Sequence, residues 1–165
     1  MIIRKAKPED AKRVAEINVI GWQTAYKGLA PDDFLAKMQV SEKKIENFKN
    51  AIENKDFVFL VAEDEGKVVG YLHGGKNTEN ANIPVQYELY GLYVDPCAWR
   101  KGVGTALVST FKKSIKDEAF CLYALKGNKQ ADNFYVKMGG KHASQHDMDH
   151  AWGNVVLRVE AFIFS

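Results

Sequence analysis

At 165 residues the chain is long enough for one domain with a sizeable core and short for two. Its apolar fraction of 46% and charged fraction of 27% are ordinary for a globular protein, and a net charge of +2 gives no basis for wholesale binding of DNA or RNA. We therefore expect a single domain over residues 1–165 and no nucleic-acid partner.

Neither a membrane-spanning segment nor an export signal is expected. The chain begins directly with the strand-like run MIIRKA, and no apolar run approaches the ~20 residues that a bilayer requires. We expect a cytoplasmic location and no membrane partner. Cys97 and Cys121 match no metal or redox spacing, and a cytoplasmic setting argues against a disulfide, so both are predicted to be free thiols.

The first third of the chain is predicted to be mainly helical. A short strand over residues 2–6 precedes a helix that Pro8 opens, and the apolar stripe of this helix continues through Trp22 and Tyr26 until Gly28 ends it. Two further helices are expected, a short one over residues 31–38 and one from Ser41 to about residue 54.

Two strands and a loop follow. Residues 57–63 form a continuous apolar run, residues 64–67 are typical of a hairpin turn, and residues 68–73 supply the antiparallel partner strand. Residues 74–84, GGKNTENANIP, are polar and rich in turn formers, so we predict a loop there.

A strand over residues 85–94 leads into a glycine-rich loop and a helix. Pro96 ends the strand because it cannot donate to a continuing ladder. Gly102 and Gly104 lack Cβ atoms, so the free N–H groups of the first helical turn can approach an anion that the helix dipole favours. Arg100 and Lys101 add positive charge, and a phosphate or diphosphate is the predicted ligand, although glycines at this spacing also occur for close packing alone. The pattern fits neither the dinucleotide fingerprint, since position 107 is Leu, nor a Walker loop.

The last third alternates strands and helices. After the helix that follows the glycines we predict a strand over residues 120–125, a helix over residues 129–138, and closing strands over residues 141–147 and 155–164. The order β-α-α-α-β-β-β-α-β-α-β-β predicts an α+β fold with a mixed sheet.

Three segments, YELYGLYVDP, RKGVGT and NKQADNFYVKMGG, together resemble the acetyl-CoA-binding core of the GNAT superfamily of N-acetyltransferases. The family loop is usually [QR]-x-x-G-x-[GA], and the later block is N-x-x-A-x-x-[FY]-Y followed by Gly. Trp99 stands where the family has Gln or Arg, which leaves the backbone contacts of residues 100–105 available, and Gly140 replaces a customary Phe. The later block is matched by Asn128, Ala131, Phe134, Tyr135 and Gly139.

The resemblance implies a GNAT-like, mostly antiparallel mixed sheet with helices on both faces, in which the strand before the loop and the strand carrying Cys121 splay apart around the pantetheine arm. It implies acetyl-CoA as co-substrate, no metal, and transfer of the acetyl group to a primary amine of a small molecule or a peptide N-terminus. Family members often pair through their sheets, so a homodimer is one state the resemblance allows. The cofactor contacts that it implies are Leu92, Tyr93, Val94, Arg100, Lys101, Gly102, Val103, Gly104, Thr105 and Asn128.

Tyr135 is the residue expected to donate a proton to the departing thiolate. A phenol with a reference pKa near ~10 is protonated at neutral pH, and helical spacing lets Tyr135 face the same cleft as Asn128. Spacing alone would favour a core aromatic, whereas the resemblance favours the catalytic role. Asn128 can contact the CoA arm and also cap its helix.

Glu88 is the expected general base, because a protonated amine cannot attack a thioester. A solvated carboxylate that merely attracts a cationic substrate is the equal alternative. Since side chains alternate along a strand, we expect one face to carry Glu88, Tyr90 and Leu92, and the other to carry Tyr87, Leu89 and Gly91.

Trp22 and Tyr26, four apart on the first helix, are predicted to line the acceptor site, with core packing as the alternative. A zinc site at His142, His146 and His150 is rejected, because spacing by four aligns ligands on a helix, whereas these residues fall on a strand and its turn.

Two other function classes stay open. One is a non-catalytic acyl-CoA-binding or sensing module, which the departure at Trp99 motivates, and the other is a phosphate-ligand enzyme of a different fold. The acceptor is not specified by the sequence, since small amines, polyamines, aminoglycosides, amino acids and protein N-termini are recognised by loops without a transferable code.

Overall fold

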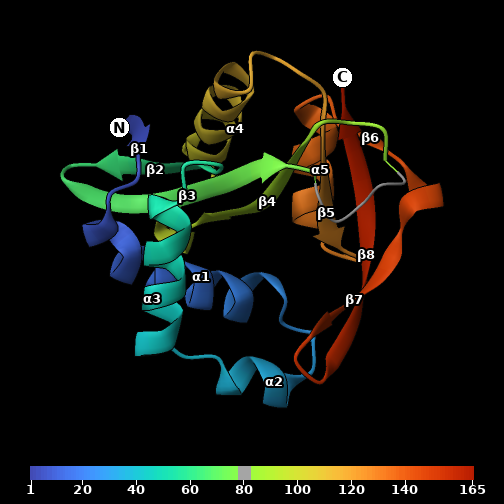
Figure 1. The fold of residues 1–165 in the computed structure, drawn as a ribbon. Coiled ribbons are helices and arrows are strands. Elements are labelled where there is room, and N and C mark those ends of the chain that lie inside the picture. Colours follow the sequence, from blue (N-terminus) through green and yellow to red (C-terminus); the bar gives the residue numbers. More distant parts are fainter. Residues whose placement is uncertain (78–82) are drawn as a thin grey trace.

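A computed structural model describes residues 1–77 and 83–165 of the chain (Figure 1). Within these ranges the backbone forms five α-helices and one eight-stranded sheet. The helices are α1 (Ala11–Ala25), α2 (Asp32–Lys37), α3 (Glu42–Glu53), α4 (Val103–Ser114) and α5 (Lys129–Lys137). The strands are β1 (Ile2–Lys5), β2 (Val58–Asp64), β3 (Lys67–Lys76), β4 (Tyr87–Val94), β5 (Phe120–Leu125), β6 (Lys141–His142), β7 (Met148–Trp152) and β8 (Val155–Phe164).

The strands of this sheet follow the order β1-β2-β3-β4-β5-β8-β6, and β7 also pairs with β8. Among the described strands β4 and β5 alone run parallel, because α4 carries the chain back across the sheet between them. All the other paired strands are antiparallel. The predicted α+β fold with a mixed, mostly antiparallel sheet is confirmed.

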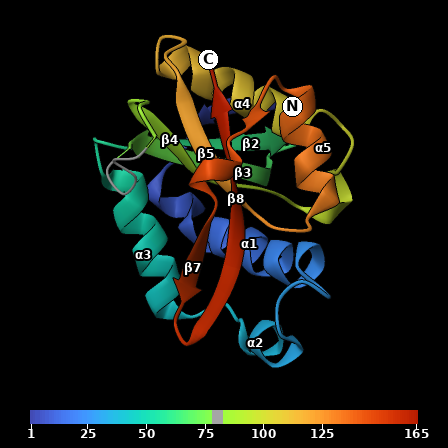
Figure 2. The ribbon, with the colours of Figure 1, turned by 90° about the vertical axis from the view of Figure 1, so that its right-hand side faces the viewer.

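Helices cover both faces of the sheet, as Figures 1 and 2 show. On one face α1 and α3 pack against the sheet through a cluster that includes Val14, Ile17 and Tyr71. On the other face α4 and α5 bury a larger cluster around Leu107 and Phe111. The sheet therefore separates two apolar cores, and a residue's face decides which core or cavity it joins.

Two predicted boundaries are wrong. Strand β3 continues to Lys76, so the predicted loop begins only at Asn77, whose N–H donates to the Gln86 carbonyl at 2.8 Å; residues 78–82 of that loop lie outside the described residues. Of the predicted strand over residues 141–147 only β6 is a strand; a 3-10 turn over Ser144–His146 follows, and β7, which begins at Met148, was not predicted. The Asp147 carboxylate accepts the Ala161 N–H at 2.9 Å, which takes the place of a ladder bond and interrupts the strand.

No helix in the described part of the chain combines the length and the apolar character needed to cross a bilayer.

Candidate active site

The strands β4 and β5 part in the middle of the sheet. Residues 87–89 of β4 pair with residues 120–122 of β5, and beyond these pairs both strands border a cavity of about 550 Å³. The backbone groups that a continuing ladder would use therefore lie at the wall of a cavity. The predicted splaying of these two strands, with Cys121 on the second, is what the structure shows.

A bulge in β4 changes which side chains share a face. In the register with β3, Gly91 pairs with His73 and Leu89 pairs with Gly74, so Tyr90 is an extra residue. The predicted alternation, which put Glu88 with Leu92, is therefore wrong. Leu92 and Leu89 pack together in the core beneath α4, whereas Glu88, which is 8% exposed, lies on the opposite face with Gly91 and Tyr93.

The glycine-rich loop opens helix α4 at one end of this cavity. Gly102 is the N-cap with φ +80°, a conformation that favours glycine, and Arg100 before it has φ +61°. The first N–H groups of α4 have no partner within the helix, and they lie at the cavity that Gly102, Val103, Gly104 and Thr105 line. The positive end of the helix dipole makes this an anion-binding geometry.

Gly102 and Gly104 are glycines for different physical reasons. A Cβ built on Gly102 meets no atom within 4 Å, so the left-handed backbone and open space distinguish this position. A Cβ on Gly104 would lie 3.2 Å from the Phe134 ring of α5, so close packing of α4 on α5 accounts for Gly104. Close packing therefore accounts for Gly104, while ligand approach at Gly102 stays a prediction that the open space there permits.

Trp99, which departs from the family motif, has a structural use. Its indole Nε1 donates to the Val94 carbonyl at 2.8 Å, which ties the turn to the last residue of β4, and its side chain lines the cavity. Asp95 fixes the same turn by accepting the Cys97 N–H at 3.0 Å and the Arg13 guanidinium of α1. Burial alone would raise the pKa of Asp95, but these hydrogen bonds outweigh burial and lower it.

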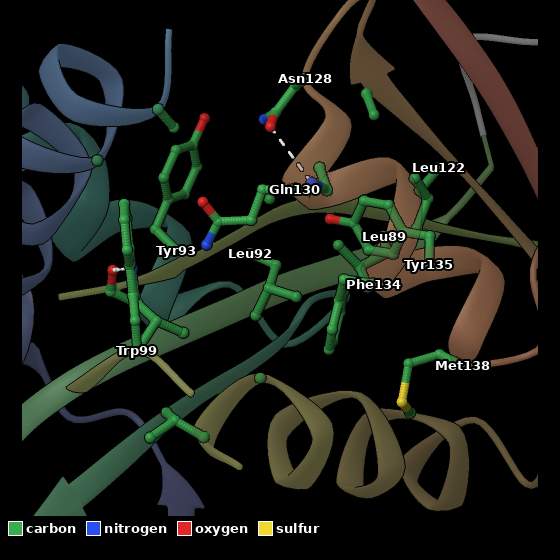
Figure 3. A pocket seen from close by; sticks show the side chains of 18 of the residues that line it. Leu89, Leu92, Tyr93, Trp99, Leu122, Asn128, Gln130, Phe134, Tyr135 and Met138 are labelled. Atoms are coloured by element: carbon green, nitrogen blue, oxygen red, sulfur yellow. Dashed lines mark hydrogen bonds between the residues drawn. The ribbon is translucent and has the colours of Figure 1, made fainter. Parts of the chain in front are cut away.

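Helix α5 supplies the side chains on the far wall. The Asn128 carbonyl oxygen caps α5 by accepting the Ala131 N–H at 3.2 Å. Tyr135 is 9% exposed, with its ring 5.6 Å from that of Phe162, and its hydroxyl points into the cavity (Figure 3). Burial raises the pKa of Tyr135 above the usual value of a phenol, so the hydroxyl stays protonated at neutral pH.

A second cavity of about 850 Å³ lies against the other face of β4. It shares Tyr26, Gly91 and Tyr93 with the first cavity, so the two spaces meet at the bulge. Glu88 and Trp22 line the second cavity and not the first. Its walls are largely rings, contributed by Trp22, Tyr26, Phe48, Phe57, Tyr71, His73, Tyr90, Tyr93, Tyr123, His150 and Trp152.

The aromatic walls of the second cavity pack on each other. The Trp22 ring lies 4.5 Å from that of Tyr26 and 5.3 Å from that of Trp152, both edge to face. The Tyr26 and Tyr93 hydroxyls are 3.3 Å apart. Trp22 and Tyr26 thus combine the two predicted alternatives, since each is packed among rings and each also borders a cavity.

His73, on β3, stands directly over the bulge. A Cβ on Gly91 would lie 2.8 Å from the imidazole, and Nδ1 is buried with no hydrogen-bond partner among the described residues. Burial lowers the pKa of His73 to about 4, so this ring is neutral at pH 7. Part of the ring still borders the second cavity.

The three histidines once considered for zinc lie on different elements. His150 is on β7 and its ring centre lies 4.4 Å from that of Trp152, whereas the His142 ring on β6 lies 4.3 Å from that of Phe162 and His146 belongs to the 3-10 turn. A different group, Asp132, His142 and Glu160, brings possible ligand atoms within 4.8 Å of one another, but none of these residues lines either cavity.

The structure brings most of the predicted cofactor residues to the first cavity, but it places one of them, Lys101, and the predicted base, Glu88, outside that cavity. Lys101 is exposed and is not among the lining residues, and Glu88 belongs to the second cavity. Sequence reasoning missed Gln130 and Met138, which α5 brings to the first cavity, and Lys44, His73 and Trp152 in the second. Spacing by four from Phe134 could have indicated Gln130 and Met138, while nothing local indicated the others.

Comparison with known proteins now gives the family. The sequence profile of the Acetyltransferase (GNAT) family matches residues 7–140. The chain belongs to this family. The GNAT relatives include an uncharacterized N-acetyltransferase, YuaI, of Bacillus subtilis, 28% identical over 72% of this chain and 66% of that protein, so the match spans slightly less than two thirds of its length.

Two further GNAT relatives are similar over most of their length. A spermidine N(1)-acetyltransferase of Thermoplasma acidophilum is 25% identical over 84% of this chain and 87% of its own. The crystal structure of the PaiA N-acetyltransferase from the same species, in complex with coenzyme A, superposes with a TM-score of 0.75 over 96% of both chains at 23% identity. This likeness confirms the GNAT fold.

Proposed function

We propose that this protein transfers the acetyl group of acetyl-CoA to a primary amine. The observation that carries the proposal is that one cavity joins the N-terminus of α4, the part of β4 beyond its pairing with β5, and the Tyr135 hydroxyl. These three features supply an anion site, amide groups for a linear chain, and a proton donor in one continuous space.

The residues fit coenzyme A. Its diphosphate would lie at the first turn of α4, where Gly102 leaves open space and Arg100 adds charge; Lys101 would act only from the rim. The pantetheine arm would follow β4, with the backbone groups of Leu92, Tyr93 and Val94 taking the place of the missing ladder. Asn128 borders the same passage.

Acetyl-CoA would supply the acetyl group as a thioester. In the reaction the amine nitrogen bonds to the carbonyl carbon, the C–S bond breaks, and the sulfur keeps the electron pair. Glu88 would take one proton from the ammonium across the bulge, directly or through water, and Tyr135 would give its phenolic proton to the departing sulfur. The second N–H proton that the nitrogen loses on becoming an amide would restore the Tyr135 phenol, so that one proton leaves to solvent from Glu88 in each turnover. Tyr135 lines the first cavity and Glu88 the second, and the two cavities meet at the bulge.

The comparisons support this proposal without specifying the acceptor. One relative is named for acetylating spermidine, and one solved structure of the same fold holds coenzyme A. The second cavity, with Trp22 and Tyr26 in its wall, is the proposed acceptor site, because it reaches the bulge from the face opposite the loop.

Calorimetry with coenzyme A and a screen of acetyl-CoA turnover over amine classes test the proposal. We expect affinity for coenzyme A and release of its thiol with at least one amine. Gly102→Asp should weaken that affinity at least tenfold, because Asp tolerates positive φ but places negative charge at the anion site.

Gly66→Asp is the matched control, since Gly66 has φ +76°, open space around it and a place in a distant hairpin turn. Absence of coenzyme A affinity in the folded protein would end the proposal. Affinity without turnover across the whole panel would favour the non-catalytic acyl-CoA-binding alternative.

A further inference from the structure

Lys44, on α3, brings a cation to the wall of the second cavity. Its ammonium donates to the Asn18 carbonyl oxygen at 3.0 Å and lies 5.9 Å from the centre of the Phe48 ring. Among the described residues no carboxylate oxygen lies within 4.0 Å of this ammonium to form an ion pair. The cation is half-buried, and its hydrogen-bond partner in the described part of the chain is the neutral Asn18 side chain.

The partner of Lys44 is held rigidly. Asn18 is 8% exposed, and its side-chain NH₂ donates to the Tyr71 hydroxyl at 2.8 Å, so its carbonyl oxygen is directed at Lys44. One N–H of the ammonium is thereby used, and the remaining donors of this group are available to a molecule in the cavity. The hydrogen bonds that connect Tyr71 to Asn18 and Asn18 to Lys44 position the cation at the cavity wall.

A half-buried ammonium without a counter-ion is a costly arrangement. Burial disfavours its charged form and lowers the pKa of Lys44. A ligand carboxylate would remove this cost by forming a charge-assisted hydrogen bond, which is stronger than the bond to the neutral amide.

The other charged groups of the second cavity lie elsewhere along it. Lys44 is connected through Asn18 to Tyr71 of β3, whereas Glu88 pairs with Gly75 of the same strand. Gly75 is four residues beyond Tyr71, which corresponds to about 13 Å along the strand. Asp56 and Lys76, both exposed, also border the cavity, and the neutral His73 lies between the two ends. One end of the cavity is thus marked by a cation and the other by a buried carboxyl group.

We propose that the acceptor of this enzyme carries a carboxylate that binds the Lys44 ammonium, so that the substrate class is an amino acid or a related amino-carboxylate. The proposal rests on the acetyl transfer proposed above and adds the chemistry of the acceptor. The amine end would lie at the bulge near Glu88, the carboxylate at Lys44, and the carbon skeleton along the aromatic wall to which the packed Trp22 and Trp152 rings belong. A polyamine would bring like charge to Lys44 and leave its donors unused.

Binding measurements with matched ligands test this assignment. Phenylalanine and phenethylamine differ by one carboxylate, as do 4-(aminomethyl)benzoate and benzylamine. Each is titrated into the protein saturated with coenzyme A, where no transfer can occur, with tryptophan fluorescence as the readout, since Trp22 and Trp152 line the cavity. We expect the carboxylate member of at least one pair to bind at least tenfold more tightly than its partner.

Variants of α3 identify the residue responsible. Lys44→Met should reduce the affinity ratio of the carboxylate ligand to its matched amine to about one, and Lys44→Arg should keep part of this ratio. Lys43→Met, which removes an exposed cation one residue away, should keep the full ratio. Absence of any preference in the wild-type protein, or a preference that survives in Lys44→Met, would overturn the proposal. A preference that depends on Lys44 in a protein that releases no thiol would support the carboxylate site and refute the acetyl transfer.

Discussion

Replacing Tyr135 by Phe removes one oxygen atom and leaves the ring in place. The ring is packed 5.3 Å from Phe134, 5.6 Å from Phe162 and 6.4 Å from Phe164, and these contacts do not involve the hydroxyl. Since the hydroxyl points into the cavity and not into the core, the free energy of unfolding should change by less than about 1 kcal/mol. Any large effect on turnover would then be an effect on chemistry.

The expected loss of turnover follows from the role proposed for this hydroxyl. General acid catalysis contributes about 10²–10⁴-fold. At 1.36 kcal/mol for each factor of ten, this is about 2.7–5.4 kcal/mol of transition-state stabilisation. Because burial raises the pKa of Tyr135, its loss of a proton should not limit the wild-type rate below about pH 10.

The assay is release of the coenzyme A thiol at saturating acetyl-CoA, with calorimetry of coenzyme A alongside. Tyr135→Phe should lower kcat by the factor above while the affinity for coenzyme A stays within about threefold of wild type. Tyr123→Phe is the matched control, because Tyr123 borders the same cavity from β5 and its pKa is also raised, to about 12, by burial. If both variants keep kcat within twofold of wild type, Tyr135 is not the proton donor.

Three more substitutions have expected outcomes. Glu88→Gln should lower kcat/KM about a hundredfold at pH 7. The difference from wild type should shrink as the pH approaches the pKa of the free amine, ~10, and a difference that stays equal at every pH would contradict the base role. Asp95→Asn should cost about 1–2 kcal/mol in urea unfolding at pH 7, after allowance for the 39% exposure of Arg13. The folded pKa of Asp95 is lowered, so this stability is fully present above about pH 4 and is lost as pH falls through the folded pKa; the same cost at pH 2 would refute the ion pair. Gly74→Ala should cost about 1–3 kcal/mol in the same assay, since its Cβ would lie 2.5 Å from the Glu88 carbonyl oxygen and 2.8 Å from Phe111, and an unchanged midpoint would show that β3 can shift.

Much of the fold followed from local patterns in the chain. Pro8, Ser41 and the pair Gly139-Gly140 mark helix ends that the structure shows within a residue or two. The convergence of the predicted cofactor residues on one cavity was equally predictable, because most of them come from two continuous motifs on either side of β5.

The face of Glu88 could not be predicted, because one inserted residue at Tyr90 reverses the alternation and bulges leave little trace in composition. The second cavity was missed for a different reason. Lys44, His73 and Trp152 come from α3, β3 and β7, and only the tertiary packing of these elements brings them together. The resemblance to the family was also silent on this cavity, which explains why the acceptor stayed open.

The two cavities share Tyr26, at the end of α1, and residues of β4 and β5, but their other walls come from different elements. The loop at Gly102 and the helix carrying Tyr135 contribute nothing to the recognition end formed by α3 and β7. On the proposed function, changes at Lys44 or Trp152 would alter which amine is accepted and leave the residues of the first cavity unchanged. Such an arrangement would let the acceptor preference change through substitutions in α3 and β7, while the bulged strand β4 and the residues of the first cavity stay the same.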